Sequence, residues 1–190
     1  MADREPRQGA VGCADHDPGV DLEAVLGIFN DAILHTTAVF HYEPHTLDMR
    51  RSWFRAKRAD NWPVWVADEG GIVQGFSTFG PFRPWPAYHY TVEHSVYVAA
   101  TARGRGLGSA LVRTVLDEAR RRELHTVVGG VVAENVASLR LHEALGFVEV
   151  AHFRQVGFKF GRWLDRKFLQ VVFDGPGSPR DGTPPPEPVQ

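Results

Sequence analysis

The stretch Arg103-Gly104-Arg105-Gly106-Leu107-Gly108 separates two runs of different periodicity. The run before it, Tyr90 to Val98, is rich in β-branched and aromatic residues and favours a β-strand. From Leu107 onward, apolar residues recur with helical spacing, and charged residues occupy the opposite side. The six residues therefore predict a glycine-rich turn that connects a strand to a helix.

Such a turn can bind an anion. Glycines let the backbone approach a ligand closely, and the first free N–H groups of a helix favour negative charge. Arg103 and Arg105 add positive charge at the same place, although many glycine-rich turns only begin a helix. The turn is not a Walker loop, because no Gly-Lys-Ser/Thr follows it. It also lacks the dinucleotide fingerprint, because His125 to Gly129 stands where an acidic residue would end the next strand.

Composition narrows the class of protein. The 190 residues are 43% hydrophobic and 23% charged, as in an ordinary globular domain. A net charge of −2 argues against a general nucleic-acid binder. The single cysteine, Cys13, excludes an intrachain disulfide and fits a reducing compartment. No apolar run approaches the ~20 residues of a membrane span, and the start is polar, so we expect a cytoplasmic protein with no membrane partner.

The order of apolar periods predicts an α/β fold. Helices are expected at 21–33, 46–59, 107–121 and 134–145, and strands at 10–13, 64–67, 72–79, 90–98, 126–132, 147–158 and 164–173. Hairpins require antiparallel neighbours and crossovers require parallel ones, so the sheet should be mixed, with helices on both faces. Residues 80–86 hold three prolines and predict an irregular loop. The ends, 1–9 and 175–190, are expected to be disordered, which leaves one domain over 10–174.

A second motif makes the glycine-rich turn more specific. The spacing Arg-x-x-Gly-x-Gly, followed by Asn135 to Phe147 with its closing Gly-Phe, resembles the GNAT superfamily of N-acetyltransferases. Four further segments, 36–40, 80–83, 90–98 and 157–163, look like the phosphinothricin and methionine-sulfoximine acetyltransferase group. The resemblance runs from about Ala10 to Phe173. It implies the GNAT fold, a mostly antiparallel sheet splayed at the acetyl-CoA site, and a homodimer.

Acetyl transfer to an amine needs a neutral amine and a donor to the developing oxyanion. A strand carboxylate can take the proton from the ammonium group. Glu93 suits this role, because it is the only acid between Glu69 and Asp117 and lies inside an apolar strand. A solvent-facing strand carboxylate is the alternative. By resemblance, Glu93 is the catalytic glutamate.

His142 is the second catalytic candidate. Most GNAT enzymes have a tyrosine at this position, whereas the phosphinothricin group, like this chain, has a histidine. A structural histidine is the alternative. The other histidines show no metal-ligand spacing, so no metal is expected. The remaining site residues follow from the resemblance. Acetyl-CoA contacts are expected from Ser95, Val96, Tyr97, Val98, Arg103, Gly104, Arg105, Gly106, Leu107, Gly108, Asn135 and Ser138.

We expect the acceptor to be bound by Phe40, by the loop before the strand that carries Glu93, and by the first residues of that strand. These residues are Phe40, Phe82, Arg83, Trp85, Tyr88, Tyr90, Thr91 and Val92. The guanidinium of Arg83 can pair with a substrate carboxylate or phosphinate, or be a solvated loop arginine. Some relatives have a second basic residue where this chain has Trp85, which leaves room for a less charged acceptor.

The resulting expectation is direct acetyl transfer from acetyl-CoA to the α-amine of a small amino acid. The acceptor would resemble methionine sulfoximine, methionine sulfone or phosphinothricin. Two alternatives remain open from the sequence. The enzyme can act on another amine, such as a polyamine or a protein N-terminus, or the chain can be a non-catalytic acyl-CoA-binding regulatory domain.

Overall fold

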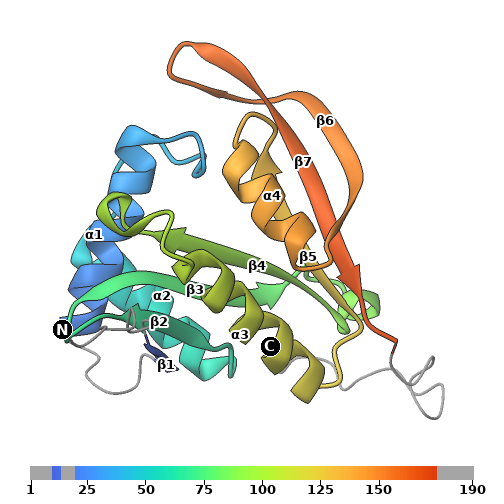
Figure 1. Cartoon of the computed structure of the whole chain (residues 1–190), viewed down its shortest axis with the longest axis horizontal. Helices are drawn as coiled ribbons and strands as arrows, with labels where there is room; N and C mark the ends of the chain where they lie inside the picture. The colour runs from blue at the N-terminus through green and yellow to red at the C-terminus, as the bar shows by residue number, and fades with distance from the viewer. Residues whose placement is uncertain (1–9, 14–19, 175–190) are drawn as a thin grey trace, which may run out of the picture.

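The computed structural model describes residues 10–13 and 20–174, and one sheet runs through them (Figure 1). Its order is β1-β2-β3-β4-β5-β7-β6, and only β4 and β5 pair in parallel. This confirms the predicted mixed, mostly antiparallel sheet. The expected disorder of 1–9 and 175–190 lies outside the described residues. The strands are β1 Ala10–Cys13, β2 Val64–Asp68, β3 Val73–Pro81, β4 Thr91–Val98, β5 Thr126–Val132, β6 Val148–Lys159 and β7 Arg162–Val172.

Helices cover both faces of the sheet, as predicted (Figure 1). On β2, Val64 and Val66 pack against α1 and α2, whereas Trp65 and Ala67 belong to the core beneath α3. This alternation is the period of a strand with two buried faces, and it gives the domain two cores. The helices are α1 Val20–His35, α2 Leu47–Ala59, α3 Leu107–Arg121 and α4 Val136–Ala144, with 3-10 turns η1 Pro86–Tyr88 and η2 Ala100–Ala102.

The sheet splays in its middle. Pairing between β4 and β5 runs from Thr91 with Thr126 to His94 with Gly129 and stops there. Beyond that point β4 continues along β3, and β5 continues along β7. The two parallel strands therefore part, and the backbone of Ser95 to Val98 lies at the edge of the opening.

The loop before β4 is shorter than predicted. β3 continues through Gly80 and Pro81, which pair with Glu93 and Val92, so the irregular segment begins at Phe82. Proline is tolerated here because Pro81 is the last residue of its strand. None of the helices in 20–174 has the length and apolar composition that a membrane span needs.

Candidate active site

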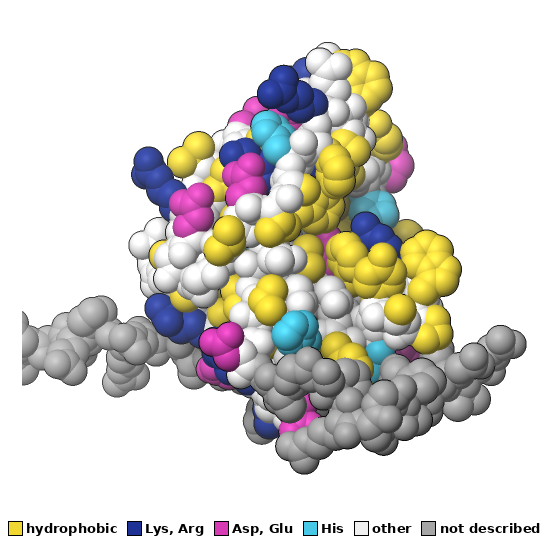
Figure 2. Space-filling model, turned by 90° about the vertical axis from the view of Figure 1, so that its right-hand side faces the viewer, with side chains coloured by type: hydrophobic (Ala, Val, Ile, Leu, Met, Phe, Trp, Pro, Cys, Tyr) yellow, Lys and Arg dark blue, Asp and Glu magenta, His cyan; other side chains and the backbone are white. Residues whose placement is uncertain are grey.

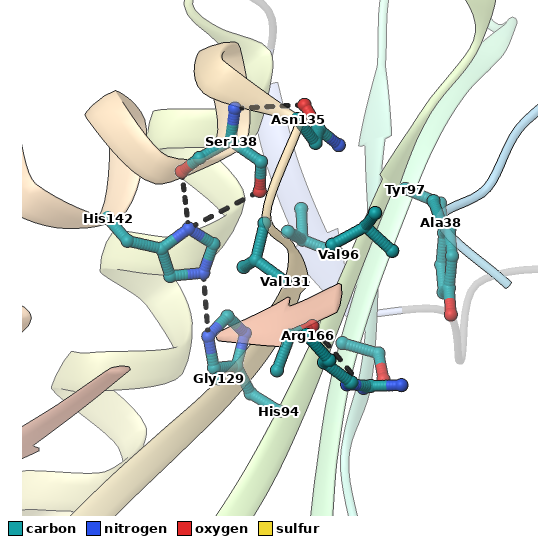
Figure 3. A pocket seen from close by; sticks show the side chains of 13 residues that line it. Ala38, His94, Val96, Tyr97, Gly129, Val131, Asn135, Ser138, His142 and Arg166 are labelled. Carbon is teal, nitrogen blue, oxygen red and sulfur yellow. Dashed lines mark hydrogen bonds between the residues drawn. The ribbon is translucent and has the colours of Figure 1, made fainter. Parts of the chain in front are cut away.

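A pocket opens where β4 and β5 part (Figure 3). The expected acetyl-CoA residues Ser95, Val96, Tyr97, Asn135 and Ser138 line it together with His142. Asn135 also caps α4, because its Oδ1 accepts a hydrogen bond from the backbone N–H of Ser138 at 3.2 Å. The pocket has further lining residues that the sequence did not single out, namely Ala38, His94, Gly129, Gly130, Val131, Val132 and Arg166.

Two buried histidines lie on the α4 side of the pocket. The Nε2 atoms of His94 and His142 are 3.1 Å apart, and His142 Nδ1 lies 2.7 Å from the carbonyl oxygen of Ser138 (Figure 3). Because a carbonyl only accepts, His142 Nδ1 carries the proton and its Nε2 accepts from His94 Nε2–H. Burial lowers the pKa of both rings, and the neighbouring imidazole lowers that of His94 further. Both histidines are therefore neutral at pH 7.

Glu93 lies on the other face of the sheet from this pair, because successive strand side chains alternate. Its carboxylate is 29% exposed and stands between two arginines. Arg83 Nη1 is 3.8 Å from Oε2, and Arg166 Nη2 is 3.7 Å from Oε1. Both distances exceed a hydrogen bond. Glu93 is not itself among the lining residues, but Arg166, its neighbour at 3.7 Å, lines the pocket.

The glycine-rich turn begins α3 as predicted. Gly104 and Gly106 have φ values of +75° and +83°, which favour glycine, and Gly106 is the N-cap of the helix. The first turn of α3 contains no acidic residue. Arg103 Nη2 lies 4.0 Å from Asp31, and Arg105 Nη2 lies 2.6 Å from Glu69, while both arginine side chains are 53% exposed. The turn thus presents helix N–H groups and two accessible guanidinium groups at one place.

Aromatic side chains gather in the loop between β3 and β4. Tyr88 packs against Phe82 and Trp85, with ring centroids 5.6 Å and 6.3 Å away. The guanidinium of Arg83 lies 4.1 Å from the centroid of Phe82. Four of the expected acceptor residues therefore form one cluster next to Glu93.

Phe40 reaches the same region from the loop after α1. Its ring lies over Gly157 of β6, where a Cβ would come within 2.8 Å of three ring carbons. Lys159, which is 3% exposed, holds this loop. Its Nζ donates to the carbonyl oxygens of Ile33, Thr36 and Val39 at 2.6, 2.9 and 2.7 Å. The loop that carries Phe40 is thus fastened to the C-terminal hairpin of β6 and β7.

Three expected acceptor residues do not join this cluster. The Val92 side chain is fully buried in the core beneath α3, because strand alternation turns it away from Glu93. Tyr90 and Thr91 lie at the start of β4 and connect neighbouring segments through their carbonyl oxygens, which accept from Thr126 and Phe82 respectively. Of the expected donor residues, Val98 accepts from Arg103 Nε at 3.3 Å, and Leu107 is buried in the core.

Comparison with known proteins places this geometry in a family. Residues 29–147 match the model of the acetyltransferase (GNAT) family. The chain belongs to the GNAT acetyltransferases. An L-methionine sulfoximine/L-methionine sulfone acetyltransferase of Salmonella typhimurium is 43% identical over 84% of this chain and 93% of its own length. A phosphinothricin N-acetyltransferase of Streptomyces coelicolor is 39% identical over 78% of this chain and 90% of its own.

A solved structure gives the same assignment. The structure of yncA of Salmonella typhimurium, described as a putative acetyltransferase with its cofactor acetyl-CoA, has a TM-score of 0.86 and 41% identity. The match covers 91% of this chain and 98% of that one. The protein is an N-acetyltransferase, and the resemblance to the methionine-sulfoximine and phosphinothricin group is confirmed.

Two residues that line the pocket, His94 and Arg166, were not predicted from the sequence. His94 and Arg166 meet the pocket only because distant segments converge, and spacing along the chain does not reveal that. The sequence does hold a partial signal, because a glycine doublet inside a strand, Gly129-Gly130, often marks a close approach. The structure has this approach on both faces, since a Cβ at Gly129 would meet His94 and His142, and one at Gly130 would meet Arg166. Within 10–13 and 20–174, histidine, cysteine and acidic side chains form no group of three that could hold a metal.

Proposed function

We propose that this acetyltransferase moves an acetyl group from acetyl-CoA to the α-amine of a small L-amino acid. The acceptor class is that of methionine sulfoximine, methionine sulfone and phosphinothricin, the compounds for which the two relatives are named. One observation carries the proposal: Glu93 stands between two arginines, and one of them, Arg166, lines the pocket. A zwitterionic acceptor needs a base for its ammonium group and cations for its carboxylate, and this arrangement offers both.

The chain has a fitting place for the donor. The N-terminus of α3 with Arg103 and Arg105 suits the diphosphate, because its N–H groups and positive charge converge there. The unpaired edge at Ser95 to Val98 suits a pantetheine arm, which carries amide groups that bond like a strand. Acetyl-CoA supplies the acetyl group as an electrophilic thioester.

The protein's own groups then perform the transfer. Glu93 accepts the proton from the acceptor ammonium, directly or through a water molecule, and frees the lone pair on nitrogen. Backbone N–H groups of Ser95 to Val98 donate to the thioester carbonyl oxygen as negative charge develops there. The amine nitrogen bonds to the thioester carbon, the C–S bond breaks, and CoA leaves as a thiolate, while the second proton of the nitrogen passes to this thiolate or to solvent. Transfer is therefore direct, and no acyl-enzyme is formed.

His142 we assign to positioning. Both of its ring nitrogens already have partners, one in α4 and one in β4. A neutral ring held in this way is a poor proton donor to a departing thiolate. It instead fixes the first turns of α4, and with them Asn135 and Ser138, against the donor pocket.

The structure favours an amino acid over the other amines considered. A polyamine would place several positive charges beside Arg83 and Arg166, and like charges disfavour binding. A protein N-terminus would lack the free α-carboxylate for which a second arginine is useful.

The test is a thiol-release assay with purified protein, acetyl-CoA and a panel of acceptors. The panel contains L-amino acids, L-methionine sulfone, L-methionine sulfoximine, phosphinothricin, spermidine and a short peptide. We expect the highest kcat/KM with the sulfone or sulfoximine. Because Trp85 occupies the place of a second basic residue, phosphinothricin should be a weaker acceptor. A preference for spermidine or the peptide would refute the assignment.

We also propose that the enzyme is a homodimer that pairs through its C-terminal hairpin. Figure 2 views the molecule from the right-hand side of Figure 1, where β6 and β7 lie, and shows hydrophobic side chains gathered on this face. A large apolar patch on one surface is typical of a protein interface. Eight large hydrophobic residues of the hairpin are each at least 47% exposed, namely Val148, Val150, Phe153, Val156, Phe158, Phe160, Trp163 and Val172.

A further inference from the structure

Arg166 lies in β7 at a half-buried position, and its side chain reaches into the pocket (Figure 3). Its guanidinium lies against Gly130, where any Cβ would come within 2.6 Å of Nε. Nη2 donates to the carbonyl oxygen of Gly130 at 3.3 Å. Phe40 and Phe168 flank the group, with ring centroids 5.3 Å and 5.4 Å from Cζ. The side chain is therefore seated in a defined position rather than spread on the surface.

The guanidinium of Arg166 has fewer hydrogen-bond acceptors than N–H donors. Its Nε is buried and has no hydrogen-bond partner among the described residues, and its Nη2 is 3.7 Å from Glu93. Arginine has five N–H donors in a planar fork, and a buried donor without a partner costs free energy. A carboxylate that accepts from two of these donors at once would satisfy the fork.

The position of Arg166 relative to Glu93 indicates which carboxylate of a ligand Arg166 would bind. The α-carboxylate of an amino acid is separated from its amine by a single carbon. A cation that binds it must therefore lie next to the base that receives the ammonium proton, and on the side that faces the donor. Arg166 meets both conditions, because it is adjacent to Glu93 and lines the donor pocket. Arg83 meets only the first, since it lies in the loop between β3 and β4.

We propose that Arg166 determines acceptor specificity by binding the α-carboxylate of the substrate, while Arg83 faces the polar end of the substrate's side chain. This inference rests on the proposed amino-acid acceptor. The sequence Arg83, Glu93, Arg166 then reads as positive, negative, positive. It complements an acceptor with a distal oxygen-rich group, an ammonium and a carboxylate in that order.

The experiment compares two acceptors that differ only at the carboxylate, L-methionine sulfone and its carboxamide. We expect wild-type enzyme to favour the acid. Arg166→Met keeps the packing over Gly130 but removes the fork, and Arg166→Lys keeps the charge without the fork. Each should lower kcat/KM for the acid by about 10- to 100-fold, mainly through KM, which is the range for a hydrogen bond to a charged group. Neither variant should change kcat/KM for the carboxamide, or the KM for acetyl-CoA, by more than a few-fold.

Arg113→Met is the matched control, because Arg113 is exposed on α3 and makes no contact with the pocket. A thermal melt of each variant separates misfolding from lost recognition. An equal loss for acid and carboxamide would overturn the inference, and so would a wild-type enzyme that does not distinguish the two. Wild-type enzyme that acetylates neither compound but accepts a simple amine would instead refute the proposed function, and this inference with it.

Discussion

The Nε2 atoms of His94 and His142 lie 3.1 Å apart in the buried space between β4 and α4, with one ring donating to the other. This contact requires a neutral His142 ring, because a protonated His142 would present a second donor to His94 Nε2–H, and two imidazolium groups would repel. The pair therefore links the packing of α4 against the sheet to the protonation of two side chains.

Acidification should destabilise the fold through this pair. Burial and the neighbouring ring lower the pKa of His94 from 6.5 to about 3, so the unfolded chain binds more protons than the folded one between these values. Stability contributed by neutral His94 is present above pH 6.5 and is lost as the pH falls below it. The expected loss is about 1.4 kcal/mol per pH unit for one proton.

Urea unfolding at a series of pH values between 7.5 and 4.5 measures this loss. His94→Gln can still donate to His142 but does not titrate, so its profile should be flatter than that of wild type. Parallel profiles for the two proteins would show that His94 does not carry the acid sensitivity.

Removal of the proposed base should separate chemistry from binding. Glu93→Gln keeps the size of the side chain but cannot accept a proton, so kcat should fall by about 10²- to 10⁴-fold near pH 7. The deficit should narrow as the pH rises, because the acceptor then loses its proton to solvent. His142→Gln, the comparison variant, should cost less than about tenfold if its role is positioning. A Glu93→Gln enzyme with normal kcat would exclude Glu93 as the base.

The two arginines of the glycine-rich turn should act on the diphosphate alone. Arg103→Gln together with Arg105→Gln should raise the KM for acetyl-CoA by about tenfold or more at low salt, and less at high salt, because exposed charges are screened. S-acetylpantetheine has no diphosphate, so its kcat/KM should be unchanged. Arg113→Gln on the same helix is the control. Equal effects on both donors would mean that the turn does not bind the diphosphate.

Lys159 should be important for stability far beyond an ordinary surface lysine. Lys159→Met leaves three carbonyl oxygens without their buried donor, and we expect a loss of roughly 3 kcal/mol, given about 1–3 kcal/mol for one unsatisfied buried group. Lys167→Met on β7 removes only a partly exposed pair with Glu149, worth about 0–1 kcal/mol. Denaturant titration compares the two. Similar losses would contradict the role assigned to Lys159.

Charged substitutions on the C-terminal hairpin of β6 and β7 test the proposed dimer. Val150→Glu with Val156→Glu places two carboxylates in the exposed apolar surface of β6, which should yield a monomer in light scattering without loss of the monomer fold. Ile72→Glu introduces the same change at an exposed residue between β2 and β3 and should leave the assembly intact. A wild-type protein that is already monomeric at micromolar concentration would disprove the dimer.

Local patterns were enough to predict most of the elements. The helical spacing after Leu107 predicts α3, and the predicted glycine-rich turn is found with left-handed backbone at Gly106. The helix expected at 46–59 is α2, Leu47–Ala59, and the hydroxyl of Thr46 caps it by accepting from the N–H of Met49. These features depend on a few adjacent residues, which is why sequence alone revealed them.

The parts of the site that sequence missed depend on register and long-range contact. Arg166 reaches Gly130 because β7 pairs with β5 so that Phe168 lies opposite Gly130 and Arg166 opposite Val132. Shifting the register by one residue would turn Arg166 to the other face of the sheet. The burial of the Val92 side chain could not be predicted for a related reason, since motif resemblance does not record which way a strand residue points.

The attachment of the Phe40 loop to β6 through Lys159 and Gly157 has an evolutionary consequence. In the proposed site, acetyl-CoA is held by α3, α4 and the middle strands, whereas the amine acceptor lies beside the loop that the last hairpin fastens. Substitutions in that hairpin can change which amine is acetylated without changing how acetyl-CoA is bound. A lineage with this layout can explore new acceptors without having to rebuild its use of the donor.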